Sequence, residues 1–326
     1  MSFTVTQESF ESLTACWNDT HQYLPWTPLF VLPAWLKVWW QELGAGSELH
    51  LGAIREDGHV VGIAPLLVKE AQAAIVGSPD VCDYLDFVIA PGKETDFYNI
   101  LLDDLKKQAI HHLDLRPLRP ESTVCAHLVN IARQRGDEVI PGAEDVSVEL
   151  DLPATWEEYL RGLDGKQRHE IGRKLRRLAG EGKVEYRTVK DKEAMPEALE
   201  AFFKMFTESR QDKAMFLTDK RESFFRSMTG AMAEISLLRF GVLDLDKQPV
   251  AMVLYFDYKD SVYLYNSGYN PDYSSLSVGV LCKVLCIQEC IQQGKKKFDF
   301  LKGDETYKYH LGGKAVSLYN CQINIK

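Results

Sequence analysis

The chain has 326 residues, of which 45% are hydrophobic and 26% are charged, and its formal net charge is -9. A chain of this length exceeds what one hydrophobic core usually serves, so we expect two domains, residues 1–152 and residues 153–326. The acidic balance argues against general affinity for DNA. No apolar run approaches the roughly 18 residues that span a bilayer, and the first residues lack a signal-peptide pattern, so we expect a cytoplasmic protein without a transmembrane segment.

The first half is predicted to combine helices with strands. Helices are expected up to about Thr20 and from Pro33 to Gly44, and strands follow from Leu49 around an Asp57-Gly58 hairpin turn. A helix near residues 95–108, the strand HLDLRPL, a helix near residues 122–135 and the strand VSVELDLP complete this half. A similar order of elements recurs in the second half, which predicts two related α/β domains in tandem.

A basic segment follows the opening helix of the second half. Ile171, Leu175 and Leu178 form an apolar stripe, so we predict a helix that packs on the body with its basic face outward. That face either meets coenzyme phosphates, an anionic substrate or tRNA, or is a solvated surface. Its basic residues, set against the single acid Glu170, are Lys166, Arg168, Arg173, Lys174, Arg176 and Arg177.

The rest of the second half is predicted to be a sheet with a helical crossover. The strand KVEYRTV and helices near residues 195–209 and 220–233 come first, and RQDKAMFLTD between those helices is predicted to be either an active-site flap or a connecting loop. The strands ISLLRFGVLD, VAMVLYFDY and SVYLYNSGY then precede an apolar helix from about Ser275 to Gln293 and the strand KFDFL. Because a helix joins the last two strands, they must be parallel.

The turn before that apolar helix is the first candidate site. Gly268, Asn270 and Pro271 end the strand, and Ser274 or Ser275 can cap the helix. A helix N-terminus offers free N–H groups and a partial positive charge, which suit a pyrophosphate. A plain helix start is the competing interpretation. The residues predicted to bind a coenzyme are Ser275, Ser277, Val278 and Gly279.

The ends of the third strand and of the crossover strand carry the second group of candidates. Asp304 and Glu305 are candidate bases, because adjacent carboxylates raise one another's pKa, and their competing interpretation is a polar turn. Tyr307 and Tyr269 are candidate proton donors that otherwise serve packing. The candidate substrate-binding residues are Lys302, Lys308, Asn266 and Arg173. Cys282, Cys286 and Cys290 recur at spacing four without nearby histidines, which predicts a buried helix face, and no metal site is expected.

The motifs KFDFLKGDETYKYHLGG and GYNPDYSSLSVGVLCKVL resemble those of the CelD-like acetyltransferases of the GNAT superfamily, relatives of the FemABX peptidyltransferases. PAWLKVWW is similar to their early tryptophan-rich helix, and KQRHEIGRKLRRL to their basic helix. The resemblance implies two tandem GNAT-like acyltransferase domains, each a mixed, mostly antiparallel sheet flanked by helices, of which the first is degenerate. In such sheets the third and crossover strands splay apart, and the exposed backbone contacts the donor and the oxyanion.

The resemblance also implies transfer of an acyl group from acetyl-coenzyme A, a co-substrate, to an amine or hydroxyl of a small molecule or an envelope precursor, as in cell-envelope or exopolysaccharide biosynthesis. By position, Asp304, Glu305, Tyr307 and Lys308 match the family's final motif, and Lys308 lies where FemABX relatives carry a lysine that meets substrate phosphate. The chain departs from the pattern at three positions. They are Lys302, where arginine is usual, Val278, where proline is usual, and His310.

Two alternatives stay open. A FemABX-like peptidyltransferase would take its aminoacyl group from charged tRNA, and the basic helix from Lys166 to Arg177 is the feature that distinguishes this reading. The second alternative is a non-catalytic protein that binds an envelope precursor or a partner.

Overall fold

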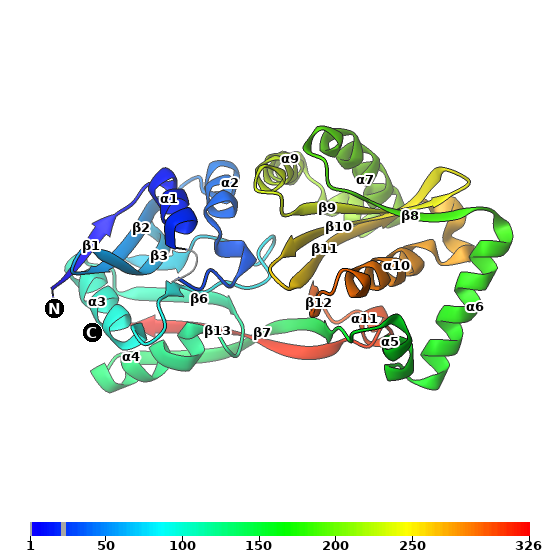
Figure 1. The fold of residues 1–326 in the computed structure, drawn as a ribbon. Coiled ribbons are helices and arrows are strands. Elements are labelled where there is room, and N and C mark those ends of the chain that lie inside the picture. The colour runs from blue at the N-terminus through cyan, green and yellow to red at the C-terminus, as the bar shows by residue number, and fades with distance from the viewer. Residues whose placement is uncertain (1, 21–23) are drawn as a thin grey trace. The chain divides into compact units, whose positions relative to one another are not determined.

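The computed structural model describes residues 2–20 and 24–326. These residues form two compact units: unit 1 comprises the chain up to Val146 together with Val316–Lys326, and unit 2 comprises Ser147–Ala315 (Figure 1). Each unit is a mixed, mostly antiparallel sheet flanked by helices, which confirms the predicted tandem α/β fold. The units do not divide at residue 152, because the C-terminal residues return to unit 1. Separate roles for the two predicted halves stay a prediction.

Unit 1 is built on an antiparallel meander. Strands β1 to β4 pair in sequence order, β6 lies parallel to β4, and β13 lies antiparallel to β6. The expected turn at Asp57 and Gly58 is present, since both residues have positive φ. The elements are β1 (Phe3–Gln7), α1 (Phe10–Thr20), α2 (Pro33–Leu43), β2 (Glu48–Glu56), β3 (His59–Lys69), β4 (Gln72–Ile75), β5 (Val88–Ile89), α3 (Glu94–Lys107), β6 (His112–Leu118), α4 (Val129–Arg135), β7 (Glu138–Asp151) and β13 (Lys314–Asn324), the last two with residues in both units.

Unit 2 has the strand order β8-β9-β10-β11-β12-β7. All neighbours are antiparallel except β11 and β12, which are parallel as the crossover predicts. Tight turns at Asp246 and Lys247 and at Lys259, all with positive φ, join β9 to β10 and β10 to β11. The elements are α5 (Trp156–Gly162), α6 (Gly165–Glu181), β8 (Val184–Val189), α7 (Met195–Ser209), α8 (Gln211–Phe216), α9 (Asp219–Glu234), β9 (Leu238–Leu245), β10 (Gln248–Tyr258), β11 (Ser261–Tyr269), α10 (Val278–Gln292), β12 (Lys297–Lys302) and α11 (Thr306–His310).

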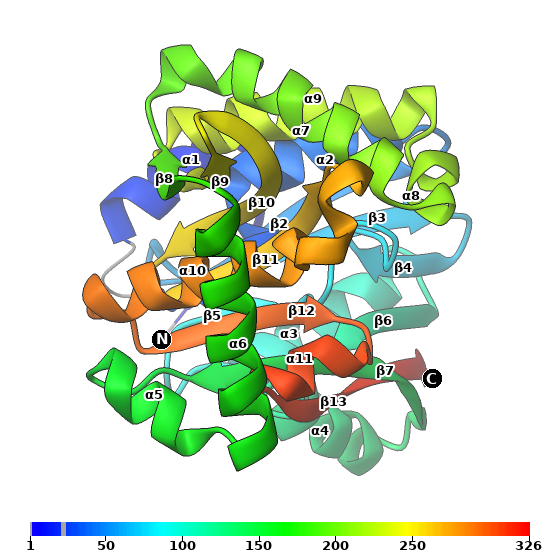
Figure 2. The same ribbon diagram turned by 90° about the vertical axis from the view of Figure 1, so that its right-hand side faces the viewer.

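Helices cover both faces of the unit 2 sheet. Helices α7 and α9 lie on one face and α10 lies on the other, with α6 packed across α10 (Figure 1, Figure 2). Helix α7 approaches β11 closely, because a Cβ atom at Gly268 would lie 2.5 Å from the backbone nitrogen of Phe206. Large aromatic side chains fill the core. The fully buried ones in this unit include Phe202, Phe224, Phe225, Phe240, Phe256 and Phe298.

Several expectations need correction. The chain begins with strand β1 rather than a helix, because Phe3–Gln7 pairs with β2. The segment predicted to be a flap or a loop contains α8, a helix too short for apolar periodicity to reveal. The sequence also gave no sign of the short helix α11 or of β13.

Candidate active site

Strands β11 and β12 part soon after they pair. Ser261–Tyr263 pairs with Lys297–Asp299, whereas β11 continues to Tyr269 and β12 to Lys302. Beyond these pairs, the two strands share no further pairing among the described residues. We call this feature the β11–β12 opening. It leaves one edge of β11 without a neighbouring strand inside the sheet.

The register shows which backbone groups face the β11–β12 opening. The Asn270 N–H donates to the Val250 carbonyl at 2.9 Å, and hydrogen-bonded pairs recur at every second residue of an antiparallel ladder. Gly268 therefore bonds to β10, and the N–H and C=O of Ser267 face away from β10. The Ser267 carbonyl thus lies on the edge that β12 leaves open.

Lys213 of α8 reaches this edge. Its ammonium group donates to the Ser267 carbonyl and lies 5.0 Å from the ring centre of Phe206. Burial, followed by the charges of Lys283 and Arg210, lowers the pKa of Lys213 to about 8. No sequence pattern marks Lys213, because it lies in a segment without periodicity.

Lys283 is a second buried cation near the opening. It lies on α10, donates to the Gly279 carbonyl at 3.0 Å, and sits 4.9 Å from the ring centre of Tyr307. Burial lowers the pKa of Lys283 to about 8. The available signal was a lone lysine within the otherwise uncharged stretch from Val278 to Ile287.

The two predicted bases are exposed at the end of β12. The Tyr309 hydroxyl donates to the Asp304 carboxylate. Glu305 is half exposed, and its Oε2 atom lies 2.9 Å from the Nζ of Lys308. Both carboxylates are thus engaged by residues of α11, while Lys283 is buried and Lys213 is partly buried.

Lys308 holds the end of β12 together. Its Nζ donates to the carbonyls of Leu301, Lys302 and Gly303 at 2.9, 2.7 and 3.0 Å, in addition to the contact with Glu305. An ammonium group has three N–H donors, so the carbonyls use all of them. This geometry opposes the expected contact with substrate phosphate, and we assign Lys308 a structural role.

Each tyrosine candidate lies beside a residue in the first turns of α10, Tyr269 beside Gly279 and Tyr307 beside Lys283. Tyr307 is partly buried beside Phe300, with ring centres 6.3 Å apart, and desolvation raises the pKa of its phenol. Tyr269 ends β11, and a Cβ atom at Gly279 would lie 3.0 Å from its ring. The structure therefore brings the end of β11 to the start of α10, as a shared site requires.

Two of the predicted substrate-binding residues lie on the strands that part. Asn266 is a partly buried residue of β11, opposite Leu254 beside an irregularity of the β10–β11 ladder. Lys302 is the last residue of β12, and its carbonyl accepts one of the hydrogen bonds from Lys308. Both belong to the segments that line the β11–β12 opening.

The predicted coenzyme stretch spans the start of α10, with a different cap from the expected one. Ser277 has φ +58° and precedes the first helical residue, Val278, which is buried. A 3-10 turn (Pro271–Leu276) comes before it, and the Asn270 side chain caps that turn by accepting from the Asp272 N–H at 3.0 Å. Ser274 and Ser275 are therefore not helix caps.

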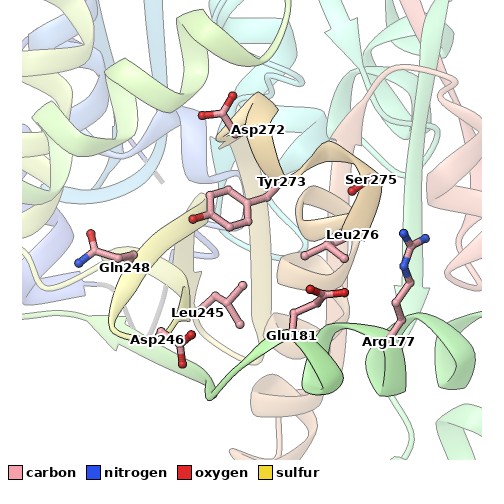
Figure 3. Close-up of a pocket in the computed structure, with 9 residues that line it drawn as sticks. All are labelled: Arg177, Glu181, Leu245, Asp246, Gln248, Asp272, Tyr273, Ser275 and Leu276. Atoms are coloured by element: carbon pink, nitrogen blue, oxygen red, sulfur yellow. The ribbon is translucent and has the colours of Figure 1, made fainter.

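A cavity of about 450 Å³ adjoins this turn (Figure 3). Ser275 and Leu276 line it together with Arg177 at the end of α6. The cavity is lined by three carboxylates and one guanidinium, and this excess of negative charge disfavours a pyrophosphate. We therefore do not assign the cavity to the coenzyme, although Ser275 borders it. The remaining lining residues are Glu181, Leu245, Asp246, Gln248, Asp272 and Tyr273.

Helix α6 presents the predicted basic face outward. Ile171 and Leu178 are buried, whereas Leu175 is partly exposed. Arg173 is exposed and pairs with Glu170 at 2.6 Å, and this hydrogen-bonded pair lowers the pKa of Glu170 to about 2. The exposed cations of the helix are Lys166, Arg168, Arg173, Arg176 and Arg177.

The three cysteines of α10 line the face that packs on the sheet. All three are buried, and the Sγ of Cys282 lies 3.7 Å from the Ala251 carbonyl. Within residues 2–20 and 24–326, no group of three or more His, Cys, Asp or Glu side chains is placed to hold a metal ion. No helix in these same ranges combines the length and apolar character needed to cross a bilayer.

Residues 165–309, which lie within unit 2, match the family profile described as an acetyltransferase (GNAT) domain. The chain is similar in fold to the crystal structure of FemX, with 12% identity over 98% of this chain and 96% of that one and a TM-score of 0.65. A conserved protein of unknown function from Bacteroides thetaiotaomicron VPI-5482 has 12% identity, full coverage of both chains (100% and 100%) and a TM-score of 0.66. L-PGS from Bacillus licheniformis has 11% identity, coverage of 89% and 90%, and a TM-score of 0.55. No curated protein matches the chain.

The profile match supports a GNAT-type domain in residues 165–309. The FemX structure supports the predicted likeness to FemABX proteins at the level of fold. The narrower likeness to CelD-like acetyltransferases stays a prediction.

The structural role of Lys308 predicts a stability effect. Lys308→Met leaves three carbonyls of the β12 end without their donor, so we expect the free energy of unfolding to fall by about 3 kcal/mol. Lys314→Met, at an exposed position of β13, is the control and should change it by less than about 0.5 kcal/mol. Urea unfolding measures both. Unchanged stability in Lys308→Met, combined with weaker binding of a phosphate-bearing substrate, would contradict the structural role.

Proposed function

We propose that the protein is an acyltransferase that moves an acyl group from acyl-coenzyme A to an amine or hydroxyl acceptor, and that this acyl group is acetyl. The GNAT profile over residues 165–309 supports this reaction class. The observation that carries the proposal is the β11–β12 opening beside the start of α10. The acceptor we propose is a small molecule or an envelope precursor in the cytoplasm.

The donor is proposed to lie along the open edge of β11. Backbone groups such as the N–H of Ser267 can pair with the amides of a pantetheine arm, since no strand occupies this edge. The first turn of α10 has N–H groups without intrahelical partners, which suit the pyrophosphate. The residues proposed for this contact are Ser275, Ser277, Val278 and Gly279.

The other candidates keep proposed roles around the opening. We propose that Tyr269 and Tyr307 hydrogen-bond the substrate beside the opening, and that Asp304 and Glu305 contribute at the exposed rim of the opening. The remaining proposed contacts are to the acceptor. They involve Asn266, Lys302 and Arg173.

A second candidate function is the transfer of an aminoacyl group from charged tRNA. The exposed basic face of α6 favours it, because phosphate backbones bind through clusters of lysine and arginine. The similarity in fold to FemX agrees with it. The two candidates differ in the donor and share the acyl-transfer chemistry.

Ser277 offers a matched test of the donor site. Its positive φ is compatible with both aspartate and asparagine, so Ser277→Asp and Ser277→Asn should fold alike. Negative charge at the helix start repels a pyrophosphate, and we expect Ser277→Asp to weaken acetyl-coenzyme A at least tenfold, about 1.4 kcal/mol, while Ser277→Asn stays within about twofold. Calorimetric titration with acetyl-coenzyme A and desulfo-coenzyme A measures this. Absence of binding of either compound to the wild type would refute the coenzyme proposal.

The basic face of α6 separates the two donors. Replacing Arg173, Arg176 and Arg177 together by glutamine should weaken tRNA binding at least tenfold if tRNA is the donor, and should leave acetyl-coenzyme A binding unchanged. The charge-matched control replaces Lys69, Lys106 and Lys107 of unit 1, all exposed. Filter binding at fixed salt is the measurement. If the wild type and both triple variants bind tRNA equally weakly, the second candidate fails.

A further inference from the structure

We propose that Lys213 is a catalytic residue: its neutral amine takes the proton that the acceptor nucleophile loses on attacking the donor carbonyl. This inference rests on the acyl transfer proposed above and supplies the proton acceptor that Asp304 and Glu305 were expected to be. Those carboxylates are exposed, and each is already engaged by a residue of α11.

Lys213 lies beside the open edge of β11. The amine of Lys213 bonds to the Ser267 carbonyl, and the β10–β11 register turns that carbonyl toward the β11–β12 opening. A donor arm that pairs with the same edge passes directly beside this amine. The Phe206 ring covers the lysine from α7 and limits its contact with water.

The surroundings of Lys213 favour the neutral form of its amine. Lys283 on α10 and Arg210 at the start of α8 oppose a proton on Lys213, while Asp212 and Glu305 favour it. Arg210 already pairs with Asp212 at 2.8 Å, and no carboxylate among the described residues lies within ion-pair distance of Lys213. Burial is the largest cause of its lowered pKa of about 8. About a tenth of the amine is therefore neutral at pH 7, and about half at pH 8.

The proposed step is balanced in atoms and charge. The acceptor nitrogen or oxygen bonds to the carbonyl carbon of the thioester, and its proton moves to the Nζ of Lys213. The tetrahedral intermediate then collapses, the C–S bond breaks, and the same proton passes from Lys213 to the departing thiolate. A lysine with a pKa near that of a thiol, about 8.5, suits both transfers. The enzyme ends as it began.

Lys213→Arg distinguishes a catalytic role of Lys213 from a role limited to donating a hydrogen bond to the Ser267 carbonyl. Arginine keeps the charge and the donor to the Ser267 carbonyl, but it is not deprotonated in proteins. Lys213→Met removes both functions, and Lys220→Arg at an exposed position of α9 is the matched control. We propose to measure coenzyme A release from acetyl-coenzyme A with hydroxylamine as the probe acceptor, between pH 6 and 10.

The expected wild-type rate rises with pH and levels off above an apparent pKa near 8, because the neutral amine is the active form. In Lys213→Arg and Lys213→Met, the rate should fall at least about 100-fold and should no longer rise with pH around 8. Their affinity for acetyl-coenzyme A should stay within about threefold of wild type. Lys220→Arg should match the wild type. A Lys213→Arg variant with the wild-type rate and pH limb would overturn the inference, whereas failure of the wild type to bind acetyl-coenzyme A overturns the proposed function itself.

A second measurement does not need an acceptor. Limited labelling by acetic anhydride, quantified by mass spectrometry across the same pH range, reports the reactivity of each amine. Lys213 should react with a midpoint near pH 8 and be protected by desulfo-coenzyme A, while the exposed Lys220 should be unaffected by the ligand. If bound desulfo-coenzyme A leaves Lys213 labelling unchanged, the amine does not lie beside the donor and the inference is refuted.

Discussion

The parting of β11 and β12 after Tyr263 and Asp299 is the constraint on which the rest of unit 2 depends. Strands that separate inside a domain leave backbone groups that need partners. Two lysines supply them from opposite sides: Lys213 donates to the β11 edge at Ser267, and Lys308 donates to three carbonyls at the end of β12. The β11–β12 opening is thus held in shape by the protein alone, with the start of α10 beside it.

This arrangement puts charge where the proposed acyl transfer needs it. The partly buried Lys213 and the buried Lys283 lie near the opening, whereas Asp304 and Glu305 lie at its exposed rim. An amine with a lowered pKa is partly neutral near neutral pH and can then accept a proton. An exposed carboxylate that is already hydrogen-bonded accepts a proton less readily at that pH. The acidic cavity beside the 3-10 turn is chemically distinct from this centre.

Sequence patterns revealed most of unit 2 and little of its chemistry. The strand order from β9 to β12 could be predicted because tight turns separate alternating strands and one long apolar helix forces a parallel crossover, whereas the place of β8 beside β9 was not predicted. The burial of Lys308 could not be predicted, because the motif YKYH does not show that α11 folds back onto β12. Lys213 was missed for a related reason: its contact with Ser267 joins residues distant in sequence through a short helix. The start of α10 differs from the prediction, because the positive φ of Ser277 replaces the expected serine cap, and the coenzyme contact of this stretch stays a proposal.

Hydrogen exchange with and without acetyl-coenzyme A tests the central claim, that the donor lies along the open edge of β11 and at the start of α10. Bound donor should slow exchange of the amides in residues 264–269 and 278–281, because it accepts from or covers these N–H groups. Strands β2 and β3 of unit 1 should exchange at the same rate in both samples. Binding of acetyl-coenzyme A without slower exchange in either segment would contradict the account.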